Sequence, residues 1–406
     1  MFRKIALVLV LILVVSLTAC GGAAEVPPPT LVVVTPLPPA TKPPPTEPPT
    51  AEPTATEPPT IEPTPTAEPP TATPPPAEEL AEKIDAFLKT QAEGNRFIGA
   101  ALVALGDEII LSKGYGMAHR EQEIPNTPTT RFRIGSLTMA FTAMAIMQLQ
   151  EQGKLNVDNP ICGYVDDCPA TWEPITVHHL LTHTSGILNH TELPEFRTVE
   201  ATPLPPSDAV QLVADRPLDF EPGSAWSYSN TGYLLLGLII EQVSGQTYEA
   251  FLQENIFDPL GMADTGYDRN RDDLATGYIN QFREADYMDM SAPFAAGALY
   301  STVEDLYRWA RAVQMDELVS ADTREQIFTQ YMPGEPGADW GYGYGWAYYP
   351  SHDRHAWGHD GFINGFVSDI VLFPEEGVTS ILLSNQEDVL TGPINGILSK
   401  WALGVE

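Results

Sequence analysis

The chain has 406 residues, enough for one large two-lobed domain or for two or three average domains. It contains 54 acidic and 21 basic side chains, which gives a formal net charge of −33. This charge argues against nucleic acids and anionic lipid surfaces as partners, because both repel an acidic protein. A hydrophobic fraction of 43% supplies enough apolar side chains for a core.

Residues 1–19 predict a bacterial export signal. Two basic residues precede the apolar run 5–15, which is too short to span a bilayer comfortably. The Leu-Thr-Ala-Cys sequence at 17–20 resembles the lipobox of bacterial lipoproteins, in which the cysteine is lipidated and the chain is cut before it. The alternative is an ordinary secretory signal with an incidental cysteine. We expect an exported, cell-surface lipoprotein anchored in the membrane through Cys20, because several acyl chains on one residue anchor stably.

A proline-rich segment follows at 20–76. Between Pro27 and Pro76 lie 21 of the 39 prolines of the chain, interleaved with threonine, alanine and glutamate. Such a composition buries too little apolar surface to offset the entropy of ordering, so the segment is expected to be unfolded but stiff. We interpret it as a stalk that carries the folded domain away from the membrane. A proline-rich docking ligand is the alternative.

One folded domain is expected over 77–406. Apolar residues at helical spacing predict a helix over 78–89. Two apolar segments on either side of a Gly-Asp pair then predict a β-hairpin. Further helices are predicted in the middle of the chain, strands return near its end, and a last helix closes it. The hairpin strands are 98–105 and 108–113, the clearest helices 137–152 and 232–243, the late strands 365–373 and 378–384, and the last helix 393–403.

This order of elements predicts an α+β fold. Strands at both ends of the domain with helices between them indicate one antiparallel sheet, built from N- and C-terminal strands and flanked by helices, with a separate helical lobe.

Cys162 and Cys168 are the only cysteines after Cys20. They lie six residues apart in a short loop, and a local disulfide is expected in an exported protein. Two free thiols are the alternative. A metal site would need further cysteines that the chain does not contain.

Ser136 stands at the start of a predicted helix, where it is suited to act as a nucleophile. An acyl-transfer site needs a nucleophile, a base and donors for the developing oxyanion, and the first N–H groups of a helix have no partners within it. Taken alone, a serine at this position is more often a helix N-cap. Two further segments support the site: Glu221–Asn230 before a predicted helix, and His355–Phe362 before a predicted strand.

In order and spacing, Ser136, Tyr228-Ser-Asn230 and His359-Asp-Gly361 resemble the three motifs of the serine β-lactamase and penicillin-binding-protein superfamily. The resemblance is to its class C β-lactamase-like hydrolases, D-stereospecific peptidases and esterases, and it covers about 78–406. Three longer phrases typical of the family lie at 180–186, 226–233 and 297–306.

The resemblance implies a role for each of these residues. Ser136 would be the acylated nucleophile and Tyr228 the proton shuttle. The backbone N–H groups of Ser136 and Phe362 would form the oxyanion hole. The other substrate-binding positions would be Asn230, which contacts the substrate's amide, and His359 and Gly361, which lie on the edge strand beside the cleft. The resemblance further implies a monomer that acts on a small molecule or peptide without any metal or organic cofactor.

Two groups of histidines fit structural roles better than metal binding. Histidines and aspartates at 352–360 suggest a zinc site, but their spacing does not match His-Glu-x-x-His, and the nearby glycines favour loop and strand. His178, His179 and His183 begin a helix-like segment, where histidines are more often capping or packing residues than ligands.

The departure from the family is Met139, which stands where the family has a lysine three residues after the serine. A thioether has neither charge nor basicity, so Tyr228 is expected to keep a pKa of about 10 and to form little phenolate. Losing a positioned base typically costs about 10²–10⁴-fold in rate. Two functions remain: a serine hydrolase that forms an acyl-enzyme on a D-alanyl peptide, β-lactam or carboxylic ester, or an impaired relative that binds cell-wall peptide or another surface ligand. A single base change, AAG to ATG, would also produce this methionine.

Overall fold

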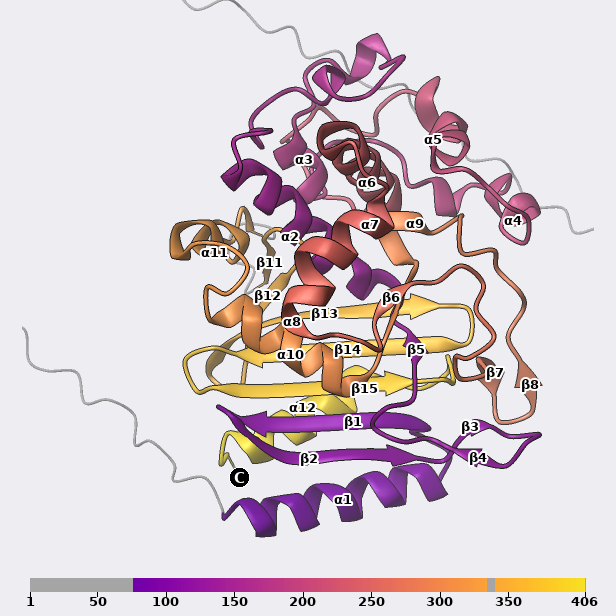
Figure 1. Cartoon of the computed structure of the whole chain (residues 1–406), viewed down its shortest axis with the longest axis vertical. Coiled ribbons are helices and arrows are strands. Elements are labelled where there is room, and N and C mark those ends of the chain that lie inside the picture. Colours follow the sequence, from indigo (N-terminus) through magenta and orange to yellow (C-terminus); the bar gives the residue numbers. More distant parts are fainter. Residues whose placement is uncertain (1–75, 334–339, 406) are drawn as a thin grey trace, which may run out of the picture. The chain divides into compact units, whose positions relative to one another are not determined.

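An eight-stranded antiparallel sheet is the centre of the computed structural model, which describes residues 76–333 and 340–405 (Figure 1). Its strand order is β10-β11-β12-β13-β14-β15-β1-β2. The strands are β1 (Gly99–Leu105), β2 (Glu108–Tyr115), β10 (Met332–Pro333), β11 (Gly341–Tyr342), β12 (Ala347–Ser351), β13 (Arg354–Ile363), β14 (Phe366–Phe373) and β15 (Val378–Ser384).

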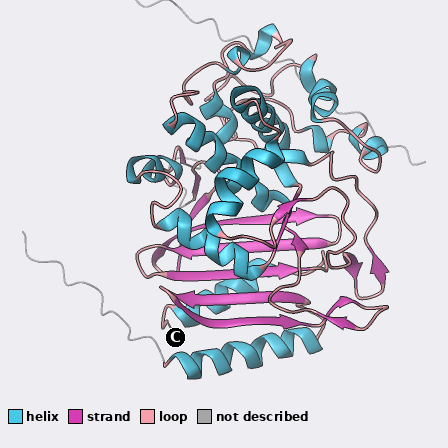
Figure 2. Cartoon of the chain, viewed as in Figure 1, coloured by secondary structure: helices cyan, strands magenta, loops and turns pink. Residues whose placement is uncertain are grey.

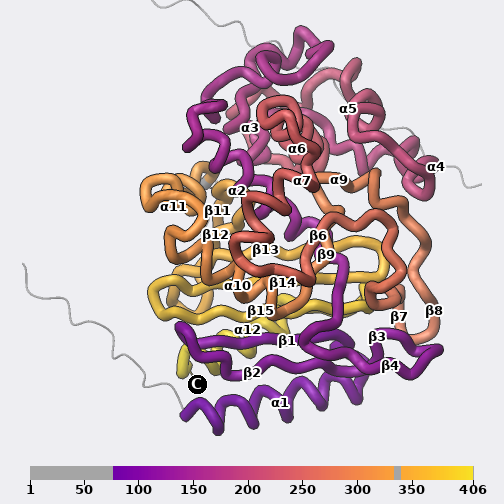
Figure 3. The backbone as a smooth tube through the Cα atoms, viewed as in Figure 1, coloured from indigo at the N-terminus to yellow at the C-terminus, as the bar shows by residue number. Residues whose placement is uncertain are grey.

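The sheet joins the two ends of the domain, as the sequence predicts. β1 pairs with β15 in an antiparallel register that places Leu102 opposite Ile381, and β1 and β2 form the predicted hairpin around Gly106. The tube view shows these early and late segments side by side (Figure 3). The predicted α+β fold is therefore confirmed.

Helices cover both faces of the sheet (Figure 2). One face packs against α1 (Ala77–Glu93) and α12 (Thr391–Ala402), with Leu382 of β15 in the apolar cluster between them. On the other face, Ile381 and Leu383 join a larger core that includes α2 (Thr138–Glu151) and α10 (Val303–Gln314). Side chains of a strand alternate between its two faces, so neighbouring residues of β15 belong to different cores.

The remaining helices form the lobe beyond the second face, around α2 and α6 (Asn230–Ser244). They are α3 (Val177–Leu181), α4 (Phe196–Val199), α5 (Pro206–Ala214), α7 (Tyr248–Leu252), α8 (Asp258–Leu260), α9 (Phe294–Gly297) and α11 (Ala321–Ile327). Short strands make three small sheets: β3 (Met117–His119) with β4 (Ile124–Pro125), β5 (Phe132–Arg133) and β6 (Gly266–Tyr267) with β9 (Leu299–Ser301), and β7 (Tyr278–Asn280) with β8 (Arg283–Glu284).

The predicted helix boundaries hold to within a few residues. α6 begins two residues earlier than predicted, because the Ser229 hydroxyl accepts the Gly232 N–H at 3.4 Å and caps the helix at Asn230. It ends at Ser244, one residue beyond the predicted end, and is followed by Gly245, whose φ of 72° a glycine adopts without strain.

Cys162 and Cys168 are joined by a disulfide. The predicted export signal, the lipidation site at Cys20 and nearly all of the predicted stalk lie outside the described residues. All described residues fall in one compact unit of the chain. Within them, none of the helices has the length and apolar character that crossing a membrane would require.

Candidate active site

Ser136 lies in a 3₁₀ turn, Gly135–Leu137, that leads directly into α2. No side chain caps either this turn or α2, so the alternative that Ser136 is a helix N-cap is wrong. The serine instead lines a pocket of about 370 Å³ between the sheet and the helical lobe. Its hydroxyl is therefore available for chemistry.

Two glycines bring this turn against β13. A Cβ on Gly135, whose φ is 51°, would lie 2.8 Å from the backbone of Phe362, and a Cβ on Gly361 would lie 2.1 Å from the Ile134 carbonyl oxygen. The Ser368 hydroxyl on β14 donates to the same carbonyl at 2.7 Å. The residue before the serine thus contacts the backbone of Phe362, so the two segments assigned to the oxyanion hole lie next to each other.

We expect Gly361→Ala to destabilise the protein by about 1–3 kcal/mol, the usual range for an overpacked site. The new methyl group would overlap a backbone oxygen and push the Ser136 turn off β13. Urea unfolding measures the loss. Gly392→Ala is the matched control, because its Cβ would meet nothing within 4 Å. Equal stability of the two variants would contradict this account of the turn.

Tyr228 faces both Ser136 and Met139. Its hydroxyl donates to the Met139 Sδ atom at 3.3 Å, and Met139 is fully buried one helical turn after the serine. Burial raises the pKa of Tyr228 well above its ordinary value of about 10, and a hydrogen bond with the Ser136 side chain opposes this only in part. The expectation of an ordinary tyrosine pKa is therefore wrong, because the site removes water from the phenol without supplying a positive charge.

The ring of His183 packs against the ring of Tyr228. The two ring centroids are 4.5 Å apart, and His183 Nδ1 accepts the Ser229 N–H at 3.1 Å. Because a backbone N–H can only donate, the ring proton lies on Nε2. Burial lowers the pKa of His183 to about 3, with a smaller contribution from His359, so the ring is neutral. His183 therefore positions the Tyr228 segment and cannot replace the missing lysine as a base.

His359 is also neutral. Its Nδ1 donates to the Asp360 carbonyl at 2.6 Å, so Nε2 accepts the Tyr342 hydroxyl at 2.9 Å. Burial lowers the pKa of His359, although Asp360 acts in the opposite direction. His359 lies on β13, which pairs with both β12 and β14, so the prediction of an edge strand is wrong. The pairing with β12 ends at Gly358, just before this residue. The neutral ring presents no positive charge to a substrate.

The histidines considered for a zinc site have separate partners. His352 bonds to the Gly396 carbonyl at 2.9 Å, whereas His355 lies 3.7 Å from Glu375. Among residues 76–333 and 340–405, no three His, Cys, Asp or Glu side chains converge as metal ligands. Of the other histidines, His179 completes a capping box at the start of α3.

Asn230 lines the Ser136 pocket at the first turn of α6. Its amide nitrogen donates to Asn189 Oδ1 at 3.2 Å and to Thr191 Oγ1 at 3.1 Å. These bonds orient the side chain and leave its Oδ1 atom as the acceptor for a substrate N–H.

The sequence did not indicate two further polar residues of this pocket. Arg197 of α4 is the only lysine or arginine among the described residues that line it. His190 is fully buried, its Nδ1 bonds to Thr231 at 3.0 Å, and its Nε2 has no partner among the described residues. Burial lowers the pKa of His190 to about 4. No motif marks these residues, because they reach the pocket only when the segment after α3 folds back over α6.

Comparisons with known proteins place this geometry in a family. The sequence profile of the family described as Beta-lactamase matches residues 82–393. PbpX of Bacillus subtilis strain 168, a protein named as a candidate penicillin-binding protein, is 32% identical over 77% of this chain and 76% of its own length.

Solved structures agree. The octameric penicillin-binding protein homologue from Pyrococcus abyssi has a TM-score of 0.70 and 30% identity over 80% of this chain and 78% of its own. A D-amino acid amidase from Ochrobactrum anthropi has a TM-score of 0.70 and 25% identity over 79% of this chain and 98% of its own. The chain therefore belongs to the beta-lactamase family, within the serine hydrolase superfamily that includes the penicillin-binding proteins.

Proposed function

We propose that this protein is an exported, membrane-anchored serine hydrolase that forms an acyl-enzyme at Ser136 on an amide or ester. The observation that carries the proposal is the meeting of the Ser136 and Tyr228 side chains beside the Gly361-Phe362 edge of β13. The predicted export signal, the proline-rich segment and the charge of −33 support a location at the cell surface.

The proposed reaction follows from this arrangement. The Ser136 oxygen bonds to the substrate's carbonyl carbon while its proton passes to the Tyr228 phenolate. The N–H groups of Ser136 and Phe362 stabilise the oxyanion. The C–N or C–O bond to the leaving group then breaks, and Tyr228 returns the proton to it. Water then attacks the carbonyl carbon of the acyl-enzyme while Tyr228 takes its proton. The bond to the Ser136 oxygen breaks, and Tyr228 returns the proton to that oxygen.

The pocket and the relatives together suggest the substrate class. Apolar side chains of Phe196, Met288 and Ile363 line the pocket together with Arg197, Glu200 and Asn230. These groups suit an acyl group with an apolar side chain and a peptide-like amide. Because the similar proteins are named for penicillin binding and for D-amino acid amidase activity, we propose D-alanyl peptides, β-lactams and D-amino acid amides as substrates.

A second function is favoured by the contact between Tyr228 and Met139. With its hydroxyl donating to a thioether at 3.3 Å and its pKa raised, Tyr228 is protonated at neutral pH. In this alternative the cleft binds cell-wall peptide or another surface ligand without turnover.

Intact-mass spectrometry tests the proposal. The protein is incubated with benzylpenicillin, a nitrophenyl acetate or a D-alanyl-D-alanine peptide, and the acylated peptide is identified after digestion. We expect an adduct on Ser136 that is absent from Ser136→Ala and present in Ser207→Ala, which removes an exposed hydroxyl outside the pocket. Binding of these ligands without any adduct would select the alternative.

A further inference from the structure

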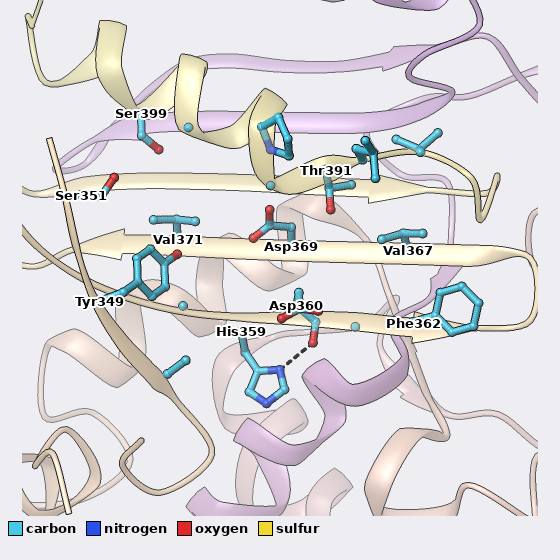
Figure 4. A pocket seen from close by; sticks show the side chains of 18 of the residues that line it. Tyr349, Ser351, His359, Asp360, Phe362, Val367, Asp369, Val371, Thr391 and Ser399 are labelled. Carbon is cyan, nitrogen blue, oxygen red and sulfur yellow. Dashed lines mark hydrogen bonds between the residues drawn. The ribbon is translucent and has the colours of Figure 1, made fainter. Parts of the chain in front are cut away.

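A second pocket, of about 570 Å³, lies on the face of the sheet opposite Ser136. Its floor is formed by β13 and β14, and α12 forms one wall (Figure 4). Apolar side chains of Val367, Val371 and Val389 line it, as do the rings of Tyr349 and Pro393. A cavity of this size and character suits a small organic molecule. It shares His359, Gly361 and Phe362 of β13 with the residues proposed for hydrolysis, but neither Ser136 nor Tyr228 lines it.

Two carboxyl groups stand side by side in this pocket. Asp360 and Asp369 are directly opposite each other in the register of β13 and β14, and both point to the same side of the sheet (Figure 4). Like charges at such positions destabilise a sheet. Neither forms an ion pair within the described part of the chain, and no described lysine or arginine lines the pocket. No cationic side chain therefore faces these two carboxyl groups, and Asp369 still keeps part of its proton at neutral pH because burial raises its pKa to about 7.

The wall opposite the carboxyl groups carries an unpartnered hydroxyl group. Ser399 of α12 is only 1% exposed and lines the pocket, yet its hydroxyl has no hydrogen-bond partner among the described residues. Asn395, one turn earlier, is fully buried beside Asp369 and favours the carboxylate form of that residue. Folded proteins leave few buried polar groups unsatisfied, so the Ser399 hydroxyl indicates a missing partner.

The helix wall is also shaped to leave space. Gly392, Asn395, Gly396 and Ser399 recur at the spacing of one helix face. A Cβ on Gly392 or Gly396 would meet nothing within 4 Å. Two glycines inside a helix lower its stability relative to alanine, by roughly 0.5–1 kcal/mol each. Packing does not require them here, and they keep the pocket open above the carboxyl groups.

We propose that this pocket binds a primary alkylammonium ion, with the carboxyl groups of Asp360 and Asp369 as its counter-charges. An ammonium group has three N–H donors and no acceptor, which matches two carboxylates and the Ser399 hydroxyl oxygen. Its alkyl chain would lie against Val367, Val371 and Tyr349. A bare divalent cation fits less well, because calcium takes six to eight oxygen ligands and no three metal-ligating side chains converge here among the described residues.

Calorimetric and thermal-shift titrations of the full chain test this. The probes are n-butylammonium and Nα-acetyl-lysine methylamide, which carry the same ammonium group as a free amine and as a peptide side chain. Neutral n-butanol, calcium and magnesium serve as comparisons at constant ionic strength. We expect saturable binding of at least one ammonium probe and none of butanol. Tighter binding of the lysine compound would identify a peptide side chain as the source, and tighter binding of butylammonium a free amine.

Three variants locate the binding. Asp369→Asn should weaken ammonium binding at least tenfold, and Gly396→Leu, whose side chain enters open space, should abolish it by filling the pocket. Glu375→Gln is the matched control, because it removes an exposed carboxylate outside the pocket and should bind like the native protein. Three results would each overturn the proposal: no binding of either probe, equal binding by Asp369→Asn and the control, or binding of calcium or magnesium without the ammonium ions.

Discussion

Replacing Met139 with lysine should increase the rate of Ser136 acylation about 10²–10⁴-fold at pH 7, the usual contribution of a positioned base. The Met139 Sδ atom already lies 3.3 Å from the Tyr228 hydroxyl, so an amine at this position would reach the tyrosine. A positive charge beside the phenol favours the phenolate and lowers its pKa. Stopped-flow or mass-spectrometric acylation by a reactive β-lactam or nitrophenyl ester measures the rate.

The pH dependence of the acylation rate distinguishes a lowered pKa of Tyr228 from a general structural change in the site. In the native protein burial raises the pKa of Tyr228, so the acylation rate should rise about tenfold per pH unit through the neutral and mildly alkaline range. Met139→Lys should level off at lower pH, and Met139→Leu, which also lacks a base, should keep the native profile. A rate that is independent of pH in the native protein, or a lysine variant no faster than the leucine variant, would show that Tyr228 is not the base.

Stability should fall by on the order of 4 kcal/mol between pH 4 and pH 7 because of Asp369 alone, since each pKa unit corresponds to about 1.4 kcal/mol. Burial raises the pKa of Asp369 from 3.8 to about 7, with Asp360 adding to the shift and Asn395 opposing it. Between these pH values the folded protein keeps a proton that the unfolded chain has lost. Because the folded state then binds more protons, raising the pH favours unfolding.

Asp369→Asn removes this titration and tests the sign. Urea unfolding should show similar stabilities for the variant and the native protein at pH 4, and a more stable variant at pH 8. The difference between the two proteins is the relevant quantity, because burial lowers the pKa of His183 and His190, which destabilises the fold at low pH. Buffers must exclude amines such as Tris, which are ligands of the proposed pocket. A variant that is less stable than the native protein at pH 8 would contradict the assignment.

The neutral state of His359 has a consequence for substrate recognition. Its ring nitrogens are committed to Tyr342 and to the Asp360 carbonyl, so β13 supplies shape and backbone donors instead of a positive charge. Arg197 is then the one lysine or arginine among the described residues that line the pocket, and Glu200 lines it as well. The Arg197 side chain would contact the part of a substrate that lies beside α4, away from β13.

Much of the architecture follows from local patterns in the sequence. The hairpin around Gly106, the α2 helix and the α6 helix up to Gly245 depend on turn residues and on apolar spacing within one segment. The order of Ser136, Tyr228 and His359 indicates the family for the same reason, because each motif is contiguous. The methionine at 139 is also evident without a structure.

How these residues behave depends on contacts that no local pattern reveals. The raised pKa of Tyr228 and the neutral His359 arise from desolvation by neighbours that are distant in sequence, such as Tyr342 and His183. The pair of Asp360 and Asp369 depends on the register of two strands, and its pocket on where α12 packs. Contiguous motifs were therefore enough for the family, the order of the elements and the loss of the lysine. Burial and strand register, which join residues from separate segments, set the charges that control the chemistry.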